Sequence, residues 1–365
     1  MTDSGSALDI VILGLSITSS WGNGHATTYR GLVRALTERG HRVLFLERDV
    51  PWYAGNRDLS APPYCRTALY ASIPELESRF ARDVQRADLV IVGSYVPDGI
   101  QVGEWVTELA EGVTAFYDID TPVTLARLAN GGTSYISTEL IPRYDLYLSF
   151  TGGPTLGRLE RELGSPCARP LYCAVDPSLY YPEPVAPRWE LGYMGTYSDD
   201  RQPTLDRLLL QPARCWEDGR FIVVGPQYPA EIAWPHNVER REHLPPSEHR
   251  AFYISQRFTL NVTRADMIAA GHSPSVRLFE AAACGTPIVS DWWEGLDELF
   301  VPGKEIVVAR DADDVLRLFH EVAEPERRAI GERARRRVLA EHTSAHRAAE
   351  LETHVCAARA RAAVR

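Results

Sequence analysis

The chain has 365 residues, of which 45% are hydrophobic and 24% are charged, and its net charge is −10. This balance is typical of a soluble globular protein of about two domains and excludes a mainly disordered chain. Its apolar runs are far shorter than the ~20 residues that span a bilayer, and its acidic N-terminal segment does not resemble a signal peptide. The acidic balance also argues against nucleic acid as a partner, so we expect a cytoplasmic protein without a transmembrane segment.

The first half of the sequence alternates short β-rich runs with amphipathic helical stretches. Helices are expected at 25–39 and 73–86. Strands are expected at 8–14, 42–47, 88–93, 113–118, 145–150 and 169–174. This alternation predicts a doubly wound parallel sheet, and the continuous apolar runs fit strands that are covered on both faces.

A second α/β series follows a change in composition. Residues 176–189 contain four prolines and no helical period, which indicates a linker. Further strands are expected at 190–196, 220–225, 258–262, 287–290 and 305–309, and a continuous helix is expected from residue 335 onward. We therefore predict an N-terminal domain (1–175), a linker (176–189), a C-terminal domain (190–340) and a final helix (341–365) that packs back toward the N-terminal domain. Ligands of such proteins bind at the carboxyl ends of the strands, between the domains.

The richest motif is the stretch 271–285, GHSPSVRLFEAAACG. Ser273 followed by Pro274 predicts a helix start, and Gly285 predicts its end about three turns later. The N-terminus of such a helix attracts anions, and Arg277 in its first turn could contact a phosphate. Glu280 could accept the two hydroxyls of a ribose. The alternative is an exposed Arg–Glu pair on an ordinary capped helix.

Basic side chains in this protein are almost all arginines. Lys304 is the single lysine among 39 basic residues, a bias that fits a GC-rich bacterial genome. A bound phosphate must therefore be held mainly by arginine, by backbone N–H groups or by helix ends.

The segment SPSVRLFEAAACGTPIVSDWWEGLDELFVPGKEIVVA resembles the donor-nucleotide region of GT-B glycosyltransferases, the group-1 glycosyl transferases. It is most similar to the branch named after the spore-maturation protein CgeB. YMGTYSDDRQP, FIVVGPQYP and FYDIDTPVTLARL resemble other elements of the same family. The resemblance implies two Rossmann-like domains that face each other across a cleft, with Glu280 at the ribose of a nucleotide sugar.

One position departs from the family pattern. Many members that retain the anomeric configuration carry E-x7-E, but the residue eight positions before Glu280 is His272. The usual sequence argument for retention therefore does not apply, although a histidine could still bind the sugar or a phosphate.

A second motif follows the first expected strand, where Gly22 and Gly24 precede His25. The glycine pattern is incomplete as a dinucleotide fingerprint, which disfavours a nucleotide-dependent oxidoreductase. It resembles the G-H segment of inverting GT-B enzymes, which implies that His25 is the general base, oriented by Asp118 or Asp120. The alternative is a histidine that only packs or caps the helix start.

Asp118 and Asp120 also form a D-x-D pair, the metal motif of GT-A glycosyltransferases. Two carboxylates at a strand end could hold a divalent cation. Because the 271–309 segment resembles GT-B enzymes instead, we expect no metal and no cofactor. Trp292, Trp293 and Glu294 follow a strand at the same sheet edge, where they could either contact a sugar or only pack.

These patterns together predict a metal-independent transferase that moves a sugar from a UDP- or GDP-linked donor to a small-molecule, natural-product or cell-surface glycan acceptor. The alternatives are a sugar-nucleotide epimerase of the same fold and a catalytically inactive nucleotide-binding module. The expected acceptor residues are Gly22, Gly24 and Thr121. The expected donor residues are Gly195, Thr196, Gly225, Pro226, Arg264, His272, Ser273, Ser275, Arg277 and Glu280.

Overall fold

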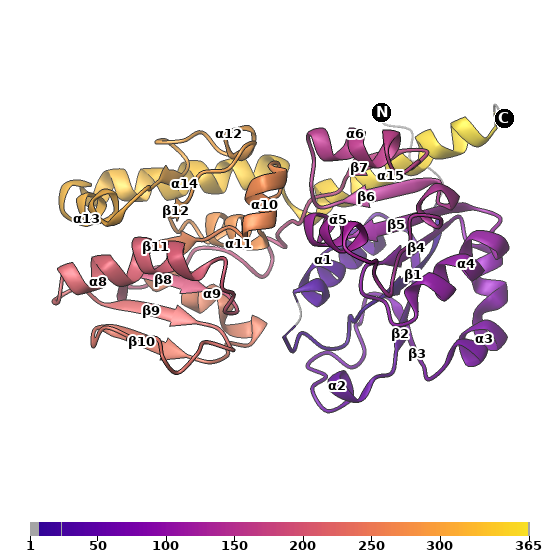
Figure 1. The fold of residues 1–365 in the computed structure, drawn as a ribbon, viewed down its shortest axis with the longest axis horizontal. Helices are drawn as coiled ribbons and strands as arrows, with labels where there is room; N and C mark the ends of the chain where they lie inside the picture. The colour runs from indigo at the N-terminus through magenta and orange to yellow at the C-terminus, as the bar shows by residue number, and fades with distance from the viewer. Residues whose placement is uncertain (1–6, 23, 364–365) are drawn as a thin grey trace. The chain divides into compact units, whose positions relative to one another are not determined.

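The computed structural model describes residues 7–22 and 24–363, and its chain divides into two compact units. Unit 1 comprises Met1–Cys173 together with Ser344–Arg365, and unit 2 comprises Ala174–Thr343. Each unit is built on one parallel sheet with helices against it (Figure 1). None of the helices within the described residues is both long and apolar enough to span a membrane.

The sheet of unit 1 has seven strands in the order β3-β2-β1-β4-β5-β6-β7. Their bounds are β1 (Asp9–Gly14), β2 (Arg42–Arg48), β3 (Arg66–Tyr70), β4 (Leu89–Gly93), β5 (Val113–Asp118), β6 (Leu146–Ser149) and β7 (Ala168–Pro170). All neighbouring pairs are parallel, and Ile12 on β1 lies opposite Phe45 on β2 and Ile91 on β4. The central strands are fully buried because helices cover both faces.

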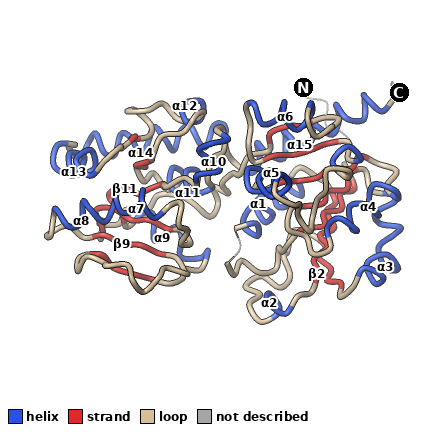
Figure 2. The backbone as a smooth tube through the Cα atoms, viewed as in Figure 1, coloured by secondary structure: helices blue, strands red, loops and turns tan. Residues whose placement is uncertain are grey.

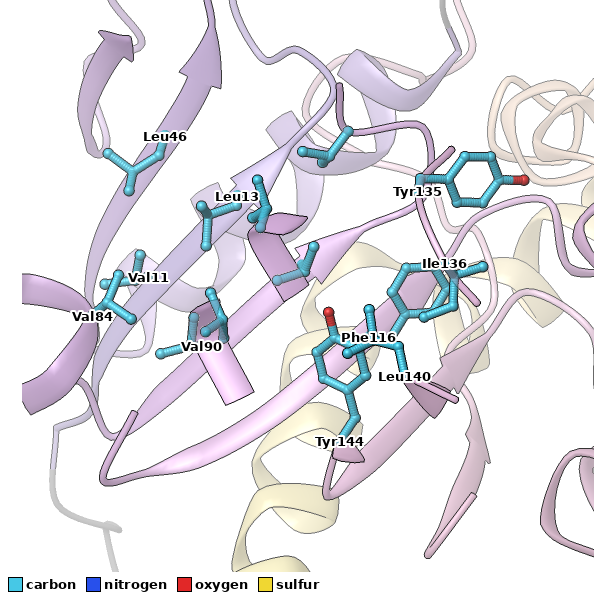
Figure 3. Close-up of a cluster of buried hydrophobic side chains, with 14 of the residues drawn as sticks. Val11, Leu13, Leu46, Val84, Val90, Phe116, Tyr135, Ile136, Leu140 and Tyr144 are labelled. Carbon is cyan, nitrogen blue, oxygen red and sulfur yellow. The ribbon is translucent and has the colours of Figure 1, made fainter. Parts of the chain in front are cut away.

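Helices α3 and α4 lie on one face of this sheet, whereas α1 and α15 lie on the other. Val11, Val90 and Phe116 point into the first of these two layers, together with residues of the segment 135–144 (Figure 3). The helices of unit 1 are α1 (His25–Glu38), α2 (Pro51–Ala54), α3 (Ile73–Arg86), α4 (Gly99–Leu109), α5 (Thr121–Ala129), a 3-10 turn η1 (Ile141–Arg143), α6 (Pro154–Arg161) and α15 (Ser344–Ala362).

The last helix, α15, is an integral part of unit 1. It packs along α1, and Glu352 accepts hydrogen bonds from Arg39 at 2.6 Å. Arg359 also pairs with Asp88, directly before β4. Unit 1 is therefore completed by residues from the far end of the chain.

Unit 2 contains a six-stranded parallel sheet in the order β10-β9-β8-β11-β12-β13. The strands are β8 (Trp189–Met194), β9 (Phe221–Val224), β10 (Val238–Arg241), β11 (Gln256–Asn261), β12 (Ile288–Ser290) and β13 (Val307–Val308). The helices are α7 (Gln202–Leu205), a π-helical turn η2 (Asp206–Leu210), α8 (Gln211–Cys215), α9 (Pro246–Ile254), α10 (Ala265–Ala270), α11 (Val276–Ala283), α12 (Leu296–Leu299), α13 (Ala312–Glu321) and α14 (Glu324–Glu341). Figure 2 shows the loops that join these elements.

Two expectations about the elements require correction. The continuous helix expected from residue 335 onward is interrupted at His342 and Thr343, because Thr343 forms a parallel bridge with Val175 there. Strands β3 and β10 were not expected. Both lie at sheet edges and are partly exposed, so their sequences lack the apolar runs of the central strands.

Candidate functional site

The carboxyl edge of the unit 2 sheet gathers most of the predicted donor residues. Because all strands are parallel, the loops that follow β8, β9, β11 and β12 emerge at the same edge. Gly195 and Thr196 follow β8, Gly225 and Pro226 follow β9, and Arg264 follows β11. Helix α11, with Arg277 and Glu280, packs against β11 and β12 beside them.

Gly225 makes a close backbone contact at this edge. Its φ is +150°, and a Cβ at this position would lie 2.0 Å from the carbonyl oxygen of Gly195. The Gly195 N–H donates to the Val224 carbonyl at 2.8 Å, and Tyr228 donates its hydroxyl to the Gly195 carbonyl at 3.1 Å. Only glycine fits here, so the loops after β8 and β9 are held together without an intervening side chain.

Arg277 is the central side chain of the edge and is only 9% exposed. Its Nε donates to the Met194 carbonyl at 2.8 Å, and its Nη1 donates to Asn261 Oδ1 at 2.8 Å. The guanidinium therefore ties the end of β8 to the end of β11. Among the described residues Nη2 has no hydrogen-bond acceptor, which leaves one N–H₂ group for a ligand on the side of Gly195.

Arg264, three residues after the end of β11 and at the N-cap of α10, contributes a second guanidinium. Its Nε is buried, and no described residue accepts a hydrogen bond from it. Asp200 lies nearby: although burial opposes ionisation, hydrogen bonds from Ser198 and the Ala265 N–H, with the charges of Arg264 and Arg201, hold the pKa of Asp200 below its usual value. A buried donor without an acceptor is costly, so Arg264 fits a site that an anion completes.

Sequence reasoning missed Arg201, which belongs to the same edge. Its Nη2 donates to the Thr196 carbonyl at 2.6 Å, and its Nε donates to Ser198 Oγ at 2.9 Å. The only signal was an arginine in a polar loop after a strand, a pattern too common to be selected alone.

The start of α11 differs from the prediction. The helix covers eight residues, about two turns, and Ser275 rather than Ser273 occupies the N-cap position. Ser275 stays extended, with ψ of 145°, and its hydroxyl accepts a hydrogen bond from Arg277 Nη1 at 3.2 Å instead of capping the helix. Ser273 is 1% exposed and lies two residues before the N-cap, so the prediction that Ser273 caps the start of the helix was wrong.

His272 adopts a left-handed backbone conformation with φ of +44°. Its N–H donates to the Glu294 carbonyl at 2.6 Å, and its Nδ1 lies 3.1 Å from Glu298 Oε2. The ring is therefore engaged with the segment that follows β12. In that segment Trp293 is buried, whereas Trp292 is half-exposed.

Glu280 is 3% exposed and accepts a hydrogen bond from the Tyr253 hydroxyl at 2.9 Å. Burial and the neighbouring Glu280 carboxylate raise the pKa of Tyr180 well above its usual value, which places that tyrosine against Glu280 as well. The alternative of an exposed Arg277–Glu280 pair is therefore wrong, because both side chains are buried and each has other partners.

A second polar edge lies in unit 1, where the loop after β1 is fixed by Glu47 at the end of β2. This buried carboxylate accepts hydrogen bonds from the backbone N–H groups of Ile17 and Thr18 at 2.8 and 3.0 Å, and from the hydroxyls of Ser16 and Thr18. The sequence signal for Glu47 was a charged residue at the end of an apolar strand. Its role is to shape the loop that leads to His25.

His25 is the first residue of α1; the residue as a whole is partly exposed, but its ring Nδ1 is buried. Its ring contacts the edge of Tyr95, with centroids 5.4 Å apart and planes at 80°. Burial lowers the pKa of His25 to about 4, so the imidazole is neutral at neutral pH. Gly22 has a left-handed φ of +59°, whereas Gly24 has an ordinary helical conformation, and nothing lies within 4 Å of a Cβ added to either residue.

Asp118 does not orient His25. Its carboxylate is fully buried and accepts hydrogen bonds from Tyr147 at 2.6 Å, from Thr124 at 2.9 Å and from the Asp120 N–H at 3.2 Å. Burial raises the pKa of Asp118 to about 6 despite these bonds. The interpretation of Asp118 as the partner of His25 therefore needs correction, because these contacts place it in the core.

Asp120 and Thr121 follow Asp118 but differ in exposure. Asp120 is half-buried and accepts a hydrogen bond from the Tyr95 hydroxyl at 3.0 Å. Thr121 is fully buried, and its hydroxyl contacts Ser149 Oγ at 2.8 Å. The expectation that Thr121 contacts an acceptor is therefore corrected: it links the ends of β5 and β6.

No cluster of three or more His, Cys, Asp or Glu side chains that could hold a metal ion occurs within residues 7–22 and 24–363. The two carboxylates of the D-x-D pair face different partners. Asp118 is enclosed by hydroxyl and N–H donors, which leaves no open side for a cation.

The fold is that of GT-B glycosyltransferases, as solved structures show. Sucrose-phosphate synthase from Thermosynechococcus elongatus is 14% identical, with a TM-score of 0.68, and the match covers 94% of this chain and 97% of that one. Anabaena HepE in complex with UDP and glucose is 13% identical, with a TM-score of 0.68 and coverage of 96% and 100%. An alpha-glucosyltransferase in complex with UDP-glucose and DNA containing an abasic site is 12% identical, with a TM-score of 0.70 and coverage of 96% and 100%.

Residues 201–353, which include most of the unit 2 edge, match the family described as glycosyl transferase-like. No curated protein matches the sequence. The resemblance to GT-B glycosyltransferases expected from the 271–309 segment is thus confirmed, while its narrower assignment to the CgeB-like branch stays a prediction.

Proposed function

We propose that the protein transfers a sugar from a nucleotide sugar, bound at the carboxyl edge of unit 2, to an acceptor bound by unit 1. The observation that carries this proposal is the pair of arginines at one sheet edge. Within residues 7–22 and 24–363, neither Arg277 Nη2 nor the buried Nε of Arg264 has a hydrogen-bond acceptor. These donors suit the two phosphates of a nucleoside diphosphate, and Glu280 in the same helix as Arg277 suits its ribose.

The chemistry follows from the charge that develops on the leaving diphosphate. Arginine donors fixed before the reaction stabilise that charge without reorganisation, so they favour the transition state over the ground state. On the acceptor side, neutral His25 could remove the proton of the attacking hydroxyl. A displacement assisted by such a base inverts the anomeric configuration.

UDP-linked sugars are the first donors to test, because solved neighbours carry UDP or UDP-glucose. A GDP-linked donor, a natural-product or a glycan acceptor, and a cytoplasmic location remain part of the proposal. An epimerase of the same fold would turn over the donor alone. A catalytically inactive module would bind the donor and form no product with any acceptor.

Thermal unfolding with UDP-, GDP- and dTDP-sugars tests the donor site directly. A ligand present at 100 times its dissociation constant should stabilise the native state by about 2.7 kcal/mol. We expect one nucleotide series to raise the melting temperature, and the rise should shrink in Glu280→Gln, which alters the proposed ribose contact. If all three series leave the melting temperature unchanged, the donor-site assignment is wrong.

Activity should survive removal of metal ions. Arginine side chains and the α11 N-terminus take the place of a cation in this site, so EDTA is expected to change the transfer rate less than twofold. Complete loss with EDTA that Mn²⁺ or Mg²⁺ restores would contradict the metal-independent mechanism. Asp118→Asn and Asp120→Asn would then show which carboxylate binds the ion.

A further inference from the structure

Tyr95 stands out in unit 1 because of its backbone. It lies two residues after β4, and its φ of +63° places a bulky side chain in the left-handed region. This conformation is unfavourable for a residue other than glycine, because the Cβ crowds the backbone. Strain of this kind persists where the surrounding contacts hold a side chain in one place, and it is concentrated at functional sites.

The contacts of Tyr95 lie around the acceptor-side residues. Its hydroxyl donates to Asp120 Oδ2 at 3.0 Å, and its ring meets the His25 ring edge-on at 5.4 Å. On its other sides, Tyr135 lies 4.7 Å away and the guanidinium of Arg127 lies 5.4 Å from the ring centroid. One side chain thus joins the half-buried carboxylate to the imidazole.

We propose that Tyr95 is a positioning residue that fixes the Asp120 carboxylate through its hydroxyl and the His25 imidazole through its ring. The role of Tyr95 in catalysis rests on the proposed function, whereas its placement of the Asp120 and His25 side chains does not. The strained backbone at residue 95 is what brings the hydroxyl and the ring to both partners at once. Tyr95 touches no reacting atom in this proposal and acts only through its two neighbours.

Several charged or titratable groups surround Tyr95, Asp120 and His25, and they can affect the pKa values measured for these residues. Helix α5 and its start bring Asp120 and Arg127, and Thr124 on the same helix links Tyr135 to the buried Asp118. Helix α1 brings His25 and, one turn later, Tyr29. Because burial raises the pKa of Asp118 to about 6, a control must separate its effect from that of Asp120.

The decisive variant is Tyr95→Phe, which keeps the ring and removes the hydrogen bond to Asp120. The Asp120 carboxylate then loses a donor to its charged form, so the pKa of Asp120 should rise, while the ring that helps to bury His25 stays in place and the pKa of His25 should not move. Tyr95→Leu also removes the aromatic ring, which should open the imidazole to solvent and raise the pKa of His25 toward its usual value. The measurement is an NMR titration of the Asp120 carboxyl and the His25 ring, whose signals are assigned by their loss in Asp120→Asn and His25→Gln.

Tyr147→Phe is the matched control, because it removes a hydroxyl from Asp118 in the same way without touching His25. We expect this variant to leave the pKa values of Asp120 and His25 in place. If Tyr95→Phe leaves the titration of Asp120 unchanged, if Tyr95→Leu leaves that of His25 unchanged, or if Tyr147→Phe shifts either as much, Tyr95 is a packing residue. Should Tyr95→Leu fail to fold, Tyr95→Phe decides the matter, and an unchanged titration of Asp120 in that variant overturns the proposal.

The titration needs no substrate, so its failure is distinguishable from failure of the proposed function. With a donor and acceptor in hand, Tyr95→Phe should lower kcat roughly ten- to hundredfold and leave the KM of the donor unchanged. An equal change in KM, or an unchanged kcat, would contradict a positioning role even if the enzyme is active.

Discussion

Arg277→Ala is expected to weaken binding of the donor nucleotide roughly 10- to 150-fold, because a hydrogen bond to a charged group contributes about 1.5–3 kcal/mol. The same change removes the donors that satisfy Met194 O and Asn261 Oδ1, so the free energy of unfolding should fall as well. The weaker binding and the lower stability can be separated by calorimetry below the melting temperature of the variant. The ligand is UDP or the UDP-sugar that thermal unfolding selects, and the quantity measured is its dissociation constant.

Two further variants sharpen this result. Arg277→Lys keeps the positive charge, but an ammonium group lacks the planar set of N–H donors with which the guanidinium bonds Met194 and Asn261. Most of the affinity for the donor nucleotide should therefore still be lost. Arg257→Ala removes an arginine that pairs with Glu190 at 2.6 Å near the amino end of β11, and donor affinity should be unchanged. A folded Arg277→Ala protein with wild-type affinity would show that Arg277 only joins the strand ends.

His25→Ala is expected to lower kcat by about 10²- to 10⁴-fold, the usual contribution of a general base. Donor affinity should barely change, because the proposed donor residues all belong to the other unit. The burial that lowers the pKa of His25 to about 4 keeps the base active in mildly acidic solution. In the wild type, kcat/KM should therefore stay level from neutral pH down to about 5 and fall only near 4.

The acidic limb should disappear in the His25→Ala enzyme. His41→Gln is a suitable control, because His41 lies at the amino end of β2 and contacts Glu352 at 2.7 Å, away from the proposed site. Two results would refute a role as base: a His25→Ala enzyme within tenfold of the wild type, or a product that retains the anomeric configuration of the donor.

The buried strands were readable from the sequence because their physics is local. Apolar runs predicted β1, β4 and β5 nearly to the residue, whereas the close backbone contact at Gly225 appears only in the structure. Edge strands such as β3 carry no such signal. An edge strand such as β3 forms because its backbone pairs with a neighbouring strand, here β2. This pairing depends on the tertiary structure and not on the local sequence.

The site was only partly readable for the same reason. Sequence spacing brought Arg277 and Glu280 to one helix, but it could not show that Arg277 turns toward the ends of β8 and β11 while Glu280 meets Tyr253. Asp118 and Asp120 looked equivalent as a D-x-D pair. Partners distant in sequence distinguish them: Tyr147 bonds Asp118 in the core, whereas Tyr95 bonds the half-buried Asp120.

The position of α15 in unit 1 has a consequence for synthesis of the protein. A ribosome releases residues 1–173 long before Ser344 and the helix that follows it, so the face of the sheet under α15 stays uncovered while all of unit 2 is translated. Unit 2 is continuous in sequence and can fold first. Unit 1 can therefore complete its packing only after the last helix has been synthesised, and the part of its sheet that α15 covers stays open until then.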